Sequence, residues 1–593
     1  MFLPTTKEEL TKLGWKKLDI IIVSGDTYID SSYNGAAAIG KVLFDAGYKV
    51  GILAQPDYKS DRDITRLGEP ELFWGVTSGC VDSMVSNYTA SKKPRRQDDF
   101  TPGGINNRRP DRAVIVYSNL IRQHLKNTKP IVLGGIEASL RRIAHYDYWD
   151  DKVRRSILFD TKADYLIYGM GEKATLEIAD CMQNEPYEGS KTFARLQNIR
   201  GICYISKTPK ENFLNLPSYQ EVAKGKMKFI EMFHTFYRNN DPVSAKGLYQ
   251  QHGDRYLIQN PPALNPTTEE IDRYHELDYE RDVHPFYRKD GKVRALDTIK
   301  FSITTHRGCY GECNFCAISV HQGTAIVSRS QESVAREAEQ IVKMPDFKGY
   351  IQDVGGPTAN MYGTGCTKMV EHGKCLKKDC VFPAACSKLD YDHEPQINLL
   401  RKLRSIKGVK KVFVTSGIRY DLILDDKESG DKYLRELIEH HISGQMKVAP
   451  EHTEDSVLGL MRKPGTGSLK EFKKRFERID REITSRRLNK LKKSDPSGGL
   501  PRNSQFLTYY LIAAHPGSTL QDELNMKQFI SRELKITPEQ VQIFTPTPST
   551  YSTLMYYTEI NPWTGEKLFV EKNAGRKERQ KRVITGKPTG KIL

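Results

Sequence analysis

The chain has 593 residues with a formal net charge of +17, and 38% of its residues are hydrophobic. Its length predicts about two to four domains, and its apolar content excludes a largely disordered chain. No apolar run is long enough to cross a bilayer and the N-terminal residues lack a signal-peptide core, so we expect a cytoplasmic protein without a membrane partner.

The first predicted domain covers residues 15–205. It opens with LDIIIVSGDTYID (18–30), an apolar strand that ends in a glycine turn, and an apolar helix and a second strand follow. Such strand–helix–strand units with short connections indicate a parallel sheet covered by helices. The same alternation repeats, with glycine turns at the carboxyl ends of strands. We predict a doubly wound α/β domain.

The segments IVLGGIEAS and DYLIYGMGE give this domain a layout that resembles the cobalamin-binding-like domain of many radical S-adenosylmethionine (SAM) enzymes. Base-off cobalamin domains carry Asp-x-His-x-x-Gly after the first strand. Here the turn GDTYIDSSYNG has Asp26, Asp30 and Gly35 but no histidine. Cobalamin is therefore not expected as a cofactor, although base-off binding without a lower ligand stays open.

Residues 206–295 form a polar stretch sprinkled with aromatic side chains. It contains the pair Pro261–Pro262 and few apolar periods. We predict a linker packed over the surface of the following domain.

Six strand–loop–helix units follow from Phe301. Eight would close an ordinary (β/α) barrel. Six predict a partial (β/α)6 barrel over residues 296–560, followed by a basic tail at 561–593. In such an architecture the loops at the carboxyl ends of the strands build the active site, and the first of them contains HRGCYGECNFCA.

That loop spaces Cys309, Cys313 and Cys316 as C-x3-C-x2-C. Three thiolates leave one iron of a cubane cluster open, because a cubane normally takes four. A zinc knuckle that lacks its fourth ligand and a chance grouping are the alternatives. With Phe315 the pattern resembles the radical SAM signature. The resemblance implies a [4Fe–4S] cluster, SAM at the open iron, reductive cleavage to a 5′-deoxyadenosyl radical, and an electron donor such as flavodoxin or ferredoxin.

The same resemblance implies where SAM lies. Gly355 and Gly356 form a turn after the second strand, where backbone can approach the methionyl amine. Lys447 and Glu451 end the fourth strand, suited to the ribose hydroxyls or the carboxylate of SAM, although Glu451 is equally suited to cap the next helix. His515 follows the fifth strand and is a candidate to face the adenine.

A second cysteine set follows the Gly–Gly turn, in an insert at 360–395. Four thiolates can close a shell around zinc or around a second iron–sulfur cluster. Their spacing matches no standard zinc ribbon, and reduced thiols in a packed insert are the alternative. The four residues are Cys366, Cys375, Cys380 and Cys386, with His372 and His393 as alternate ligands.

Positive charge concentrates in three stretches, at 91–112, 486–502 and 572–591. Each contains glycine and proline, which predicts mobile loops or a tail. A basic surface can hold phosphate backbones, so RNA is a candidate partner. Solubility and flexible connection are the other explanation for each stretch.

Long motifs along nearly the whole chain resemble the YgiQ-type family of radical SAM proteins: VLGGIEASLRRIAHYDYWDDKVRRS, HRGCYGECNFCAISVHQG, DVGGPTANMYG and KVAPEH. The resemblance implies catalysis with a cluster and SAM. It leaves the substrate open, with RNA, a small molecule and a peptide as candidates. The alternative is a non-catalytic, metal-stabilised nucleic-acid-binding protein that uses both cysteine groups structurally.

Overall fold

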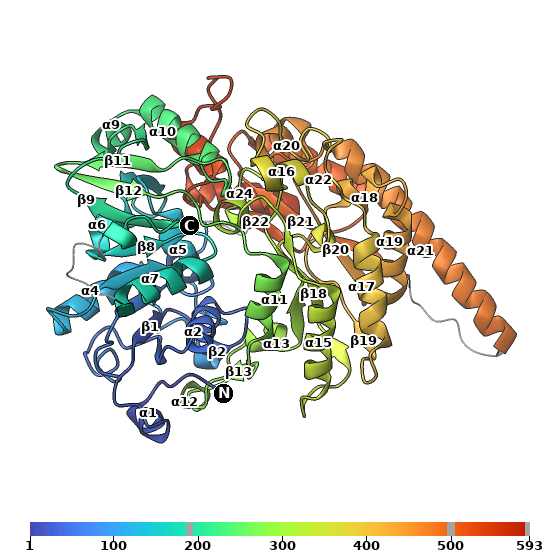
Figure 1. The fold of residues 1–593 in the computed structure, drawn as a ribbon. Helices are drawn as coiled ribbons and strands as arrows, with labels where there is room; N and C mark the ends of the chain where they lie inside the picture. The colour runs from blue at the N-terminus through green and yellow to red at the C-terminus, as the bar shows by residue number, and fades with distance from the viewer. Residues whose placement is uncertain (185–193, 495–503, 587–593) are drawn as a thin grey trace.

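The computed structural model describes residues 1–184, 194–494 and 504–586. Figure 1 shows two α/β units side by side: a sheet unit in blue and green, and a barrel-like unit in yellow and orange. Within the described ranges no helix combines the length and the apolar character needed to cross a membrane.

The sheet unit has five neighbouring parallel strands in the order β3-β1-β4-β5-β8. All residues of β1 are buried, as expected for a strand covered on both faces. Ile21 and Val23 pack into one core, and Ile20 and Ile22 pack into another. The predicted parallel sheet is therefore confirmed. The strands are β1 (Ile20–Ser24), β3 (Val50–Ala54), β4 (Phe73–Thr77), β5 (Ile131–Gly134) and β8 (Tyr165–Ile167).

Helices cover both faces of this sheet. On one face α2 (Gly35–Asp45) packs against α7 (Glu172–Asn184), and on the other α4 (Ala113–His124) packs against α6 (Ile157–Thr161). The strand order, read in chain order as 2-1-3-4-5, is that of a doubly wound fold, in which ligands bind at the carboxyl ends of the strands.

Four further strands extend the sheet in the order β10-β11-β12-β9. Most of this extension falls in the stretch that the sequence predicted to be a linker. These short strands gave no clear sequence signal, because polar residues lie even on their buried faces, as Gln250 and His252 do in β11. The strands are β9 (Ile202–Ser206), β10 (Leu214–Leu216), β11 (Leu248–His252) and β12 (Arg255–Gln259).

The remainder of that stretch joins the two units. Helix α11 (Thr268–Glu276) packs on α15 of the second unit, and β13 (Asp282–Val283) pairs with β2 (Ile29–Asp30) of the first. Arg281 donates to Glu337 on α15 at 2.5 Å. The connection is therefore packed between the units rather than laid over the barrel surface.

The second unit is a row of parallel strands. Parallel ladders join β14 to β18, β17 to β19, and β20 to β21 and β22, and a parallel bridge joins Ile418 to Val448. Within the described residues β14 and β22 do not pair, so the barrel stays open. The strands are β14 (Ser302–Thr304), β17 (Tyr350–Ile351), β18 (Asp353–Gly355), β19 (Lys411–Val412), β20 (Gln445–Glu451), β21 (Phe506–Ala513) and β22 (Val541–Ile543).

Helices bury one core on the outside of these strands. Apolar residues of β20 and β21 alternate with half-buried or exposed ones, so one face of each strand meets the helices and the other faces inward. The helices are α15 (Gln331–Val342), α17 (Glu394–Ser405), α19 (Gly430–Glu436), α21 (Thr466–Ser494) and α22 (Leu520–Phe529).

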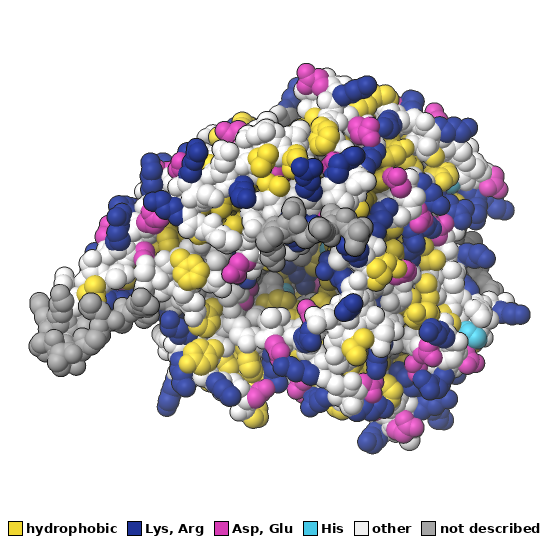
Figure 2. Space-filling model, turned by 180° about the vertical axis from the view of Figure 1, so that it is seen from behind, with side chains coloured by type: hydrophobic (Ala, Val, Ile, Leu, Met, Phe, Trp, Pro, Cys, Tyr) yellow, Lys and Arg dark blue, Asp and Glu magenta, His cyan; other side chains and the backbone are white. Residues whose placement is uncertain are grey.

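Two of the three basic stretches, predicted to be mobile, are folded into the body. In 91–112, Arg109 is buried between Asp26 and Asp98 at 2.7 and 3.1 Å. In the tail, α24 (Ala574–Thr585) packs on α22. Part of the middle stretch extends α21, and 495–503 lies outside the described residues. Figure 2 shows Lys and Arg scattered over one face rather than gathered in a stripe.

Helix α24 ties the two units together. The Lys577 ammonium lies 2.9 Å from the Tyr556 hydroxyl and 3.3 Å from that of Tyr148, in the sheet unit. Ser91 of the sheet unit donates to Glu578 at 2.5 Å. The last described helix thus closes on the first domain.

Candidate cluster and cofactor site

The three-cysteine loop lies between β15 (His306–Arg307) and α14 (Ile318–Gln322), directly after the first barrel strand. Gly308 begins the loop with φ +88°, and a Cβ there would fall 2.0 Å from the carbonyl oxygen of Ala325. Only glycine can make this turn without moving backbone. The sequence therefore fixes where the loop leaves the strand.

The cysteines of this loop are half-buried and near one another. Burial raises the pKa of Cys309 and Cys316, and the charge of Cys313 adds to both shifts, which bring the pKa of Cys316 to about 12. The Cys309 sulfur lies 3.5 Å from the Thr358 hydroxyl. Thiols in this state need a cation or a metal to become thiolates.

Arg419 supplies a positive charge at this point. Its Nη1 lies 3.8 Å from the Cys313 sulfur, and Asp421 holds the guanidinium through Nε at 3.1 Å and Nη2 at 2.5 Å. The charges of Cys313 and Cys309 help to raise the pKa of this arginine, which shows that the three groups are close. The donor set and its counter-charge fit an anionic cluster.

In the described part of the chain, no three His, Cys, Asp or Glu side chains are placed to share one metal ion. A cubane cluster takes each thiolate on a different iron, so its ligands need not converge on one point. A single zinc ion therefore gains no support at either cysteine group. Cluster ligation stays a prediction at both.

The Gly–Gly turn lies beside the cluster loop. A Cβ on Gly356 would fall 2.6 Å from the His306 ring, and one on Gly355 would fall 3.1 Å from Ser416. The same turn carries Thr358, which contacts Cys309. The turn thus lies next to the cysteines, and His306 and Ser416 fill the space that side chains at the two glycines would take. The SAM contact expected here stays a prediction.

Glu451 and Lys447 lie on β20. Glu451 is buried with φ +70°, a costly conformation for a residue with a side chain. Burial raises its pKa, and its charge raises that of Cys316, so it lies near the cluster loop. Lys447 is half-buried and alternates with core residues Met446 and Val448, so it faces the inside of the barrel.

His515 is held inside the chain. Its Nε2 lies 2.6 Å from the Ser552 hydroxyl, and its Nδ1 lies 2.8 Å from the Pro516 carbonyl oxygen. The ring is fully buried against Phe544, and burial lowers its pKa to about 3. Both ring nitrogens are occupied, so the contacts favour a structural role and give the predicted adenine contact no support.

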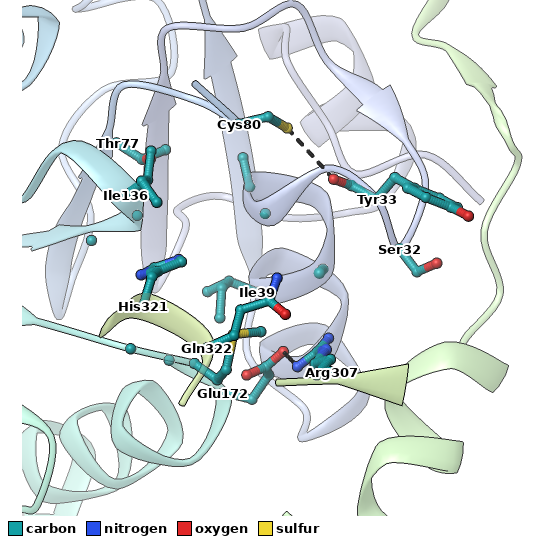
Figure 3. A pocket seen from close by; sticks show the side chains of 18 of the residues that line it. Ser32, Tyr33, Ile39, Thr77, Cys80, Ile136, Glu172, Arg307, His321 and Gln322 are labelled. Carbon is teal, nitrogen blue, oxygen red and sulfur yellow. Dashed lines mark hydrogen bonds and ion pairs between the residues drawn. The ribbon is translucent and has the colours of Figure 1, made fainter. Parts of the chain in front are cut away.

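A cavity of about 520 Å³ lies between the carboxyl ends of the sheet strands and the barrel. Thr77, Cys80 and Ile136 line it from the sheet unit, and His321 and Gln322 line it from the barrel unit (Figure 3). Gly355 and Gly356 also line it, so this cavity and the cluster loop share the Gly–Gly turn. An ion pair between Glu172 and Arg307, 2.6 Å long, joins the units at its wall.

Three histidines line this cavity with ring nitrogens that have no hydrogen-bond partner within the described residues. They are both nitrogens of His275, Nε2 of His306 and Nδ1 of His321. Burial lowers the pKa of all three, to about 4 for His306 and His321, so they are neutral at pH 7. Buried polar atoms without partners are rare and indicate a missing ligand or water.

Sequence reasoning missed these histidines because they come from α11, β15 and α14, far apart in the chain. From the sequence, a histidine ligand was considered only in the turn after β1. That turn is occupied with structural contacts: Asp26 pairs with Arg109 and accepts from the Cys80 N–H at 2.6 Å, and Asp30 pairs with Lys41 at 3.1 Å.

The insert packs on the cluster loop. Cys366, Cys380 and Cys386 share one apolar cluster with Cys309, around Tyr310. Cys366 and Cys375 raise the pKa of Cys380, and the Cys386 N–H donates to the Cys380 carbonyl at 2.8 Å. The second set therefore lies beside the first. Of the alternate ligands, His393 is bonded to Asp426 at 2.7 Å, and His372 is exposed.

Glu312, between the first two cysteines, is a buried carboxylate that sequence reasoning passed over. It binds the Lys374 ammonium of the insert, and Tyr237 donates to it at 3.2 Å. Its second oxygen is buried without a partner in the described residues. These contacts join the cluster loop to the insert, and no local motif could have shown them.

The Radical SAM N-terminal family model matches residues 2–302. A UPF0313 protein of Fusobacterium nucleatum is 56% identical over 588 residues, which cover 99% of each chain. A UPF0313 protein of Thermotoga maritima is 46% identical over 100% of each chain. The chain belongs to the UPF0313 family. The predicted resemblance to radical SAM proteins is thereby confirmed.

Solved structures with a similar fold include TsrM from Kitasatospora setae, a radical SAM methyltransferase. With tryptophan and a SAM analog bound it gives a TM-score of 0.50 at 13% identity, covering 95% of the UPF0313 chain and 88% of TsrM. TsrM with cobalamin and a [4Fe-4S] cluster bound gives a TM-score of 0.49 at 14% identity, covering 90% of the UPF0313 chain and 76% of TsrM. OxsB with aqua-cobalamin bound gives a TM-score of 0.49 at 11% identity, covering 93% of the UPF0313 chain and 57% of OxsB.

The expectation that cobalamin is not a cofactor is contradicted, because TsrM, whose fold matches this chain with a TM-score of 0.50, is also solved with cobalamin bound. The expectation rested on one absent histidine in one turn. In this UPF0313 protein the polar groups of the cavity come from other elements, so the missing motif does not decide the question.

Proposed function

We propose that this protein is a radical SAM enzyme, with a [4Fe–4S] cluster held by Cys309, Cys313 and Cys316. The observation that carries the proposal is the position of the three half-buried thiols, beside Arg419 and the Gly–Gly turn, at the carboxyl end of the barrel strands. When bound, the cluster and SAM supply reductive cleavage to a 5′-deoxyadenosyl radical.

The protein's own groups have distinct tasks in this proposal. Arg419 offsets the charge of the thiolates, and the Gly355–Gly356 turn lies beside the cluster loop, where its backbone would contact the methionyl group of SAM. Lys447 and Glu451 supply polar contacts from β20. The proposal leaves the substrate open. The basic stretches that motivated RNA are largely folded into the body, so RNA gains no specific support over a small molecule or a peptide.

We also propose that the cavity between the units holds a corrinoid. It lies at the carboxyl ends of the parallel strands, where doubly wound folds bind ligands. Gly79, Gly134 and Gly135 leave its sheet-side rim without bulky side chains. Ring nitrogens of His275, His306 and His321 that have no hydrogen-bond partner among the described residues offer polar contacts at neutral pH. These residues fit a large, partly apolar ligand.

Anaerobic reconstitution with iron and sulfide, followed by SAM and dithionite, tests the enzyme proposal. We expect 5′-deoxyadenosine, and we expect Cys309→Ala, Cys313→Ala and Cys316→Ala each to lose the cluster absorbance and all cleavage. Cys203→Ala, outside both cysteine groups, is the control and should cleave SAM like the wild type. A wild-type cluster without any SAM cleavage would overturn the proposal.

Hydroxocobalamin retained after desalting, measured by absorbance, tests the cavity. A Cβ at Gly134 meets nothing within 4 Å and lies on the cavity wall, so Gly134→Phe should fill the site without a backbone clash. Gly467→Phe, on the exposed side of α21, is the matched control. We expect at least tenfold weaker retention for Gly134→Phe alone. Equal retention by both variants, or none by the wild type, contradicts the corrinoid proposal.

A further inference from the structure

The insert has an apolar outer surface. Leu376 and Val370 are 66% and 63% exposed, among the most exposed large hydrophobic side chains in the described chain. Their neighbours in the insert pack inward on the cluster loop. Exposed aliphatic side chains next to a functional loop are typical of a surface that binds a partner.

Lysines flank these two residues along the chain. Lys368, Lys377, Lys378 and Lys388 are exposed, and within the described residues the insert's one lysine in an ion pair is Lys374. Three exposed acids, Glu371, Asp390 and Asp392, stand against these four exposed lysines and leave the insert's outer face with a positive balance of one charge. Unpaired lysines of this kind attract an acidic partner over the distance at which charges act in solution.

The surface also connects to the cluster loop. The backbone of Lys388 and the side chain of Lys378 lie close enough to Cys386 to lower the pKa of its thiol, and the Cys386 N–H donates to the Cys380 carbonyl at 2.8 Å. Cys380 and Cys386 in turn pack with Cys309. A partner seated on the insert therefore lies over side chains that pack against the cluster loop.

We propose that Lys368, Val370, Leu376, Lys377, Lys378 and Lys388 form a docking surface for a small acidic one-electron donor protein. The proposal rests on the proposed function, since it names the partner that supplies its electron. The donor loses one electron, and that electron converts SAM to methionine and the 5′-deoxyadenosyl radical. Transient electron-transfer complexes use small contact areas, and complementary charge sets their association rate.

A nucleic acid fits this surface less well than a protein. Proteins bind single-stranded nucleic acids with aromatic side chains on which bases stack, and the docking surface offers aliphatic side chains instead. Leu376 and Val370 suit an apolar patch on a protein. RNA binding is therefore an outcome that the test must be able to detect.

The test compares two electron sources in the full-length reconstituted protein. The variant Lys368→Glu/Lys377→Glu/Lys388→Glu reverses charge and leaves Lys378 in place, because Lys378 touches Cys386. With reduced flavodoxin at low salt we expect kcat/KM for SAM cleavage to fall at least tenfold. With dithionite the rate should stay within twofold of the wild type. Rising salt should slow the flavodoxin reaction of the wild type more than that of the variant.

The matched control is Lys7→Glu/Lys12→Glu/Lys16→Glu, which reverses three exposed lysines near the N-terminus, in the other unit. It should keep both rates. Should the charge variant fail to hold its cluster, Leu376→Ser decides instead, with an expected loss of at least threefold in the flavodoxin reaction alone. Flavodoxin affinity measured by calorimetry should fall in parallel.

Unchanged flavodoxin rates and affinity in both insert variants would overturn the docking surface. So would a loss of transfer-RNA binding in the charge variant while the flavodoxin reaction is kept. Absence of SAM cleavage with dithionite in the wild type would contradict the proposed function rather than the docking surface. The flavodoxin affinity measured by calorimetry would then still show whether the surface binds the donor.

Discussion

Arg419 is the positive charge nearest to the cluster-loop thiols that the described contacts reveal, 3.8 Å from Cys313. A cation beside an iron–sulfur cluster favours its reduced, more negative state. Arg419→Met should therefore lower the reduction potential of the reconstituted cluster and slow SAM cleavage about tenfold. A redox titration followed by electron paramagnetic resonance checks this. Arg419→Lys should recover most of the potential, and equal potentials for wild type and Arg419→Met would contradict the assigned role.

Lys577 is a buried lysine. Burial lowers its pKa from 10.5 to about 8. In the unfolded chain it regains its ordinary pKa, so between about pH 8 and 10.5 the unfolded state binds more protons. Stability contributed by this group should therefore rise with pH across that window, by on the order of 3 kcal/mol. Urea unfolding of wild type and Lys577→Met at about pH 8 and about pH 10.5 isolates the effect. The difference in unfolding free energy between the two proteins should change with pH, and a constant difference would contradict the predicted pH dependence.

At the scale of elements, the insert offers a second test of metal content. Cys366, Cys380 and Cys386 pack together beside Cys309, and Cys375 lies close enough to influence Cys380. If they hold a second cluster, iron per chain should exceed the amount that one cubane needs, with little zinc. Cys375→Ala/Cys380→Ala should return iron to about four per chain while SAM binding persists. Iron near four in the wild type and unchanged in the variant contradicts a second cluster.

The elements that could be predicted from the sequence are those with a local signal. The buried run of β1 and the three-cysteine loop after the first barrel strand each depend on neighbours in the chain, and each lies where expected. The strands β10 to β12 were missed because these short strands mix polar and apolar residues.

The candidate site shows the same limit. The sequence led us to expect the cysteines and the Gly–Gly turn at one site, and Thr358 of that turn contacts Cys309, while the cluster and SAM contacts stay predictions. It could not show that His275, His306 and His321 meet in one cavity, or that Glu312 binds Lys374, because contacts between distant elements leave no periodic trace. His515 was chosen by its place at a strand end, and packing against Phe544 and Ser552 occupies it instead.

At the scale of the whole molecule, α24 holds the two units together. It packs on α22 of the barrel unit and contacts Ser91 and Tyr148 of the sheet unit. Ending the chain after Lys572 should remove this contact, lower the thermal midpoint by about 4 °C or more, and weaken cobalamin retention. Ending it after Gly586 should leave both unchanged. Thermal unfolding followed by circular dichroism measures the difference, and equal midpoints for both truncations would show that α24 does not hold the units.

The position of α24 has a consequence for how the protein is made. A ribosome synthesises the chain from the N-terminus, and domains generally fold in that order. The sheet unit is complete long before Lys577 leaves the exit tunnel, so the contact with Tyr148 cannot form during most of synthesis. The cavity wall supplied by the sheet thus forms before α24 joins the sheet unit to the barrel unit. This order leaves an interval during translation for a bulky ligand to enter.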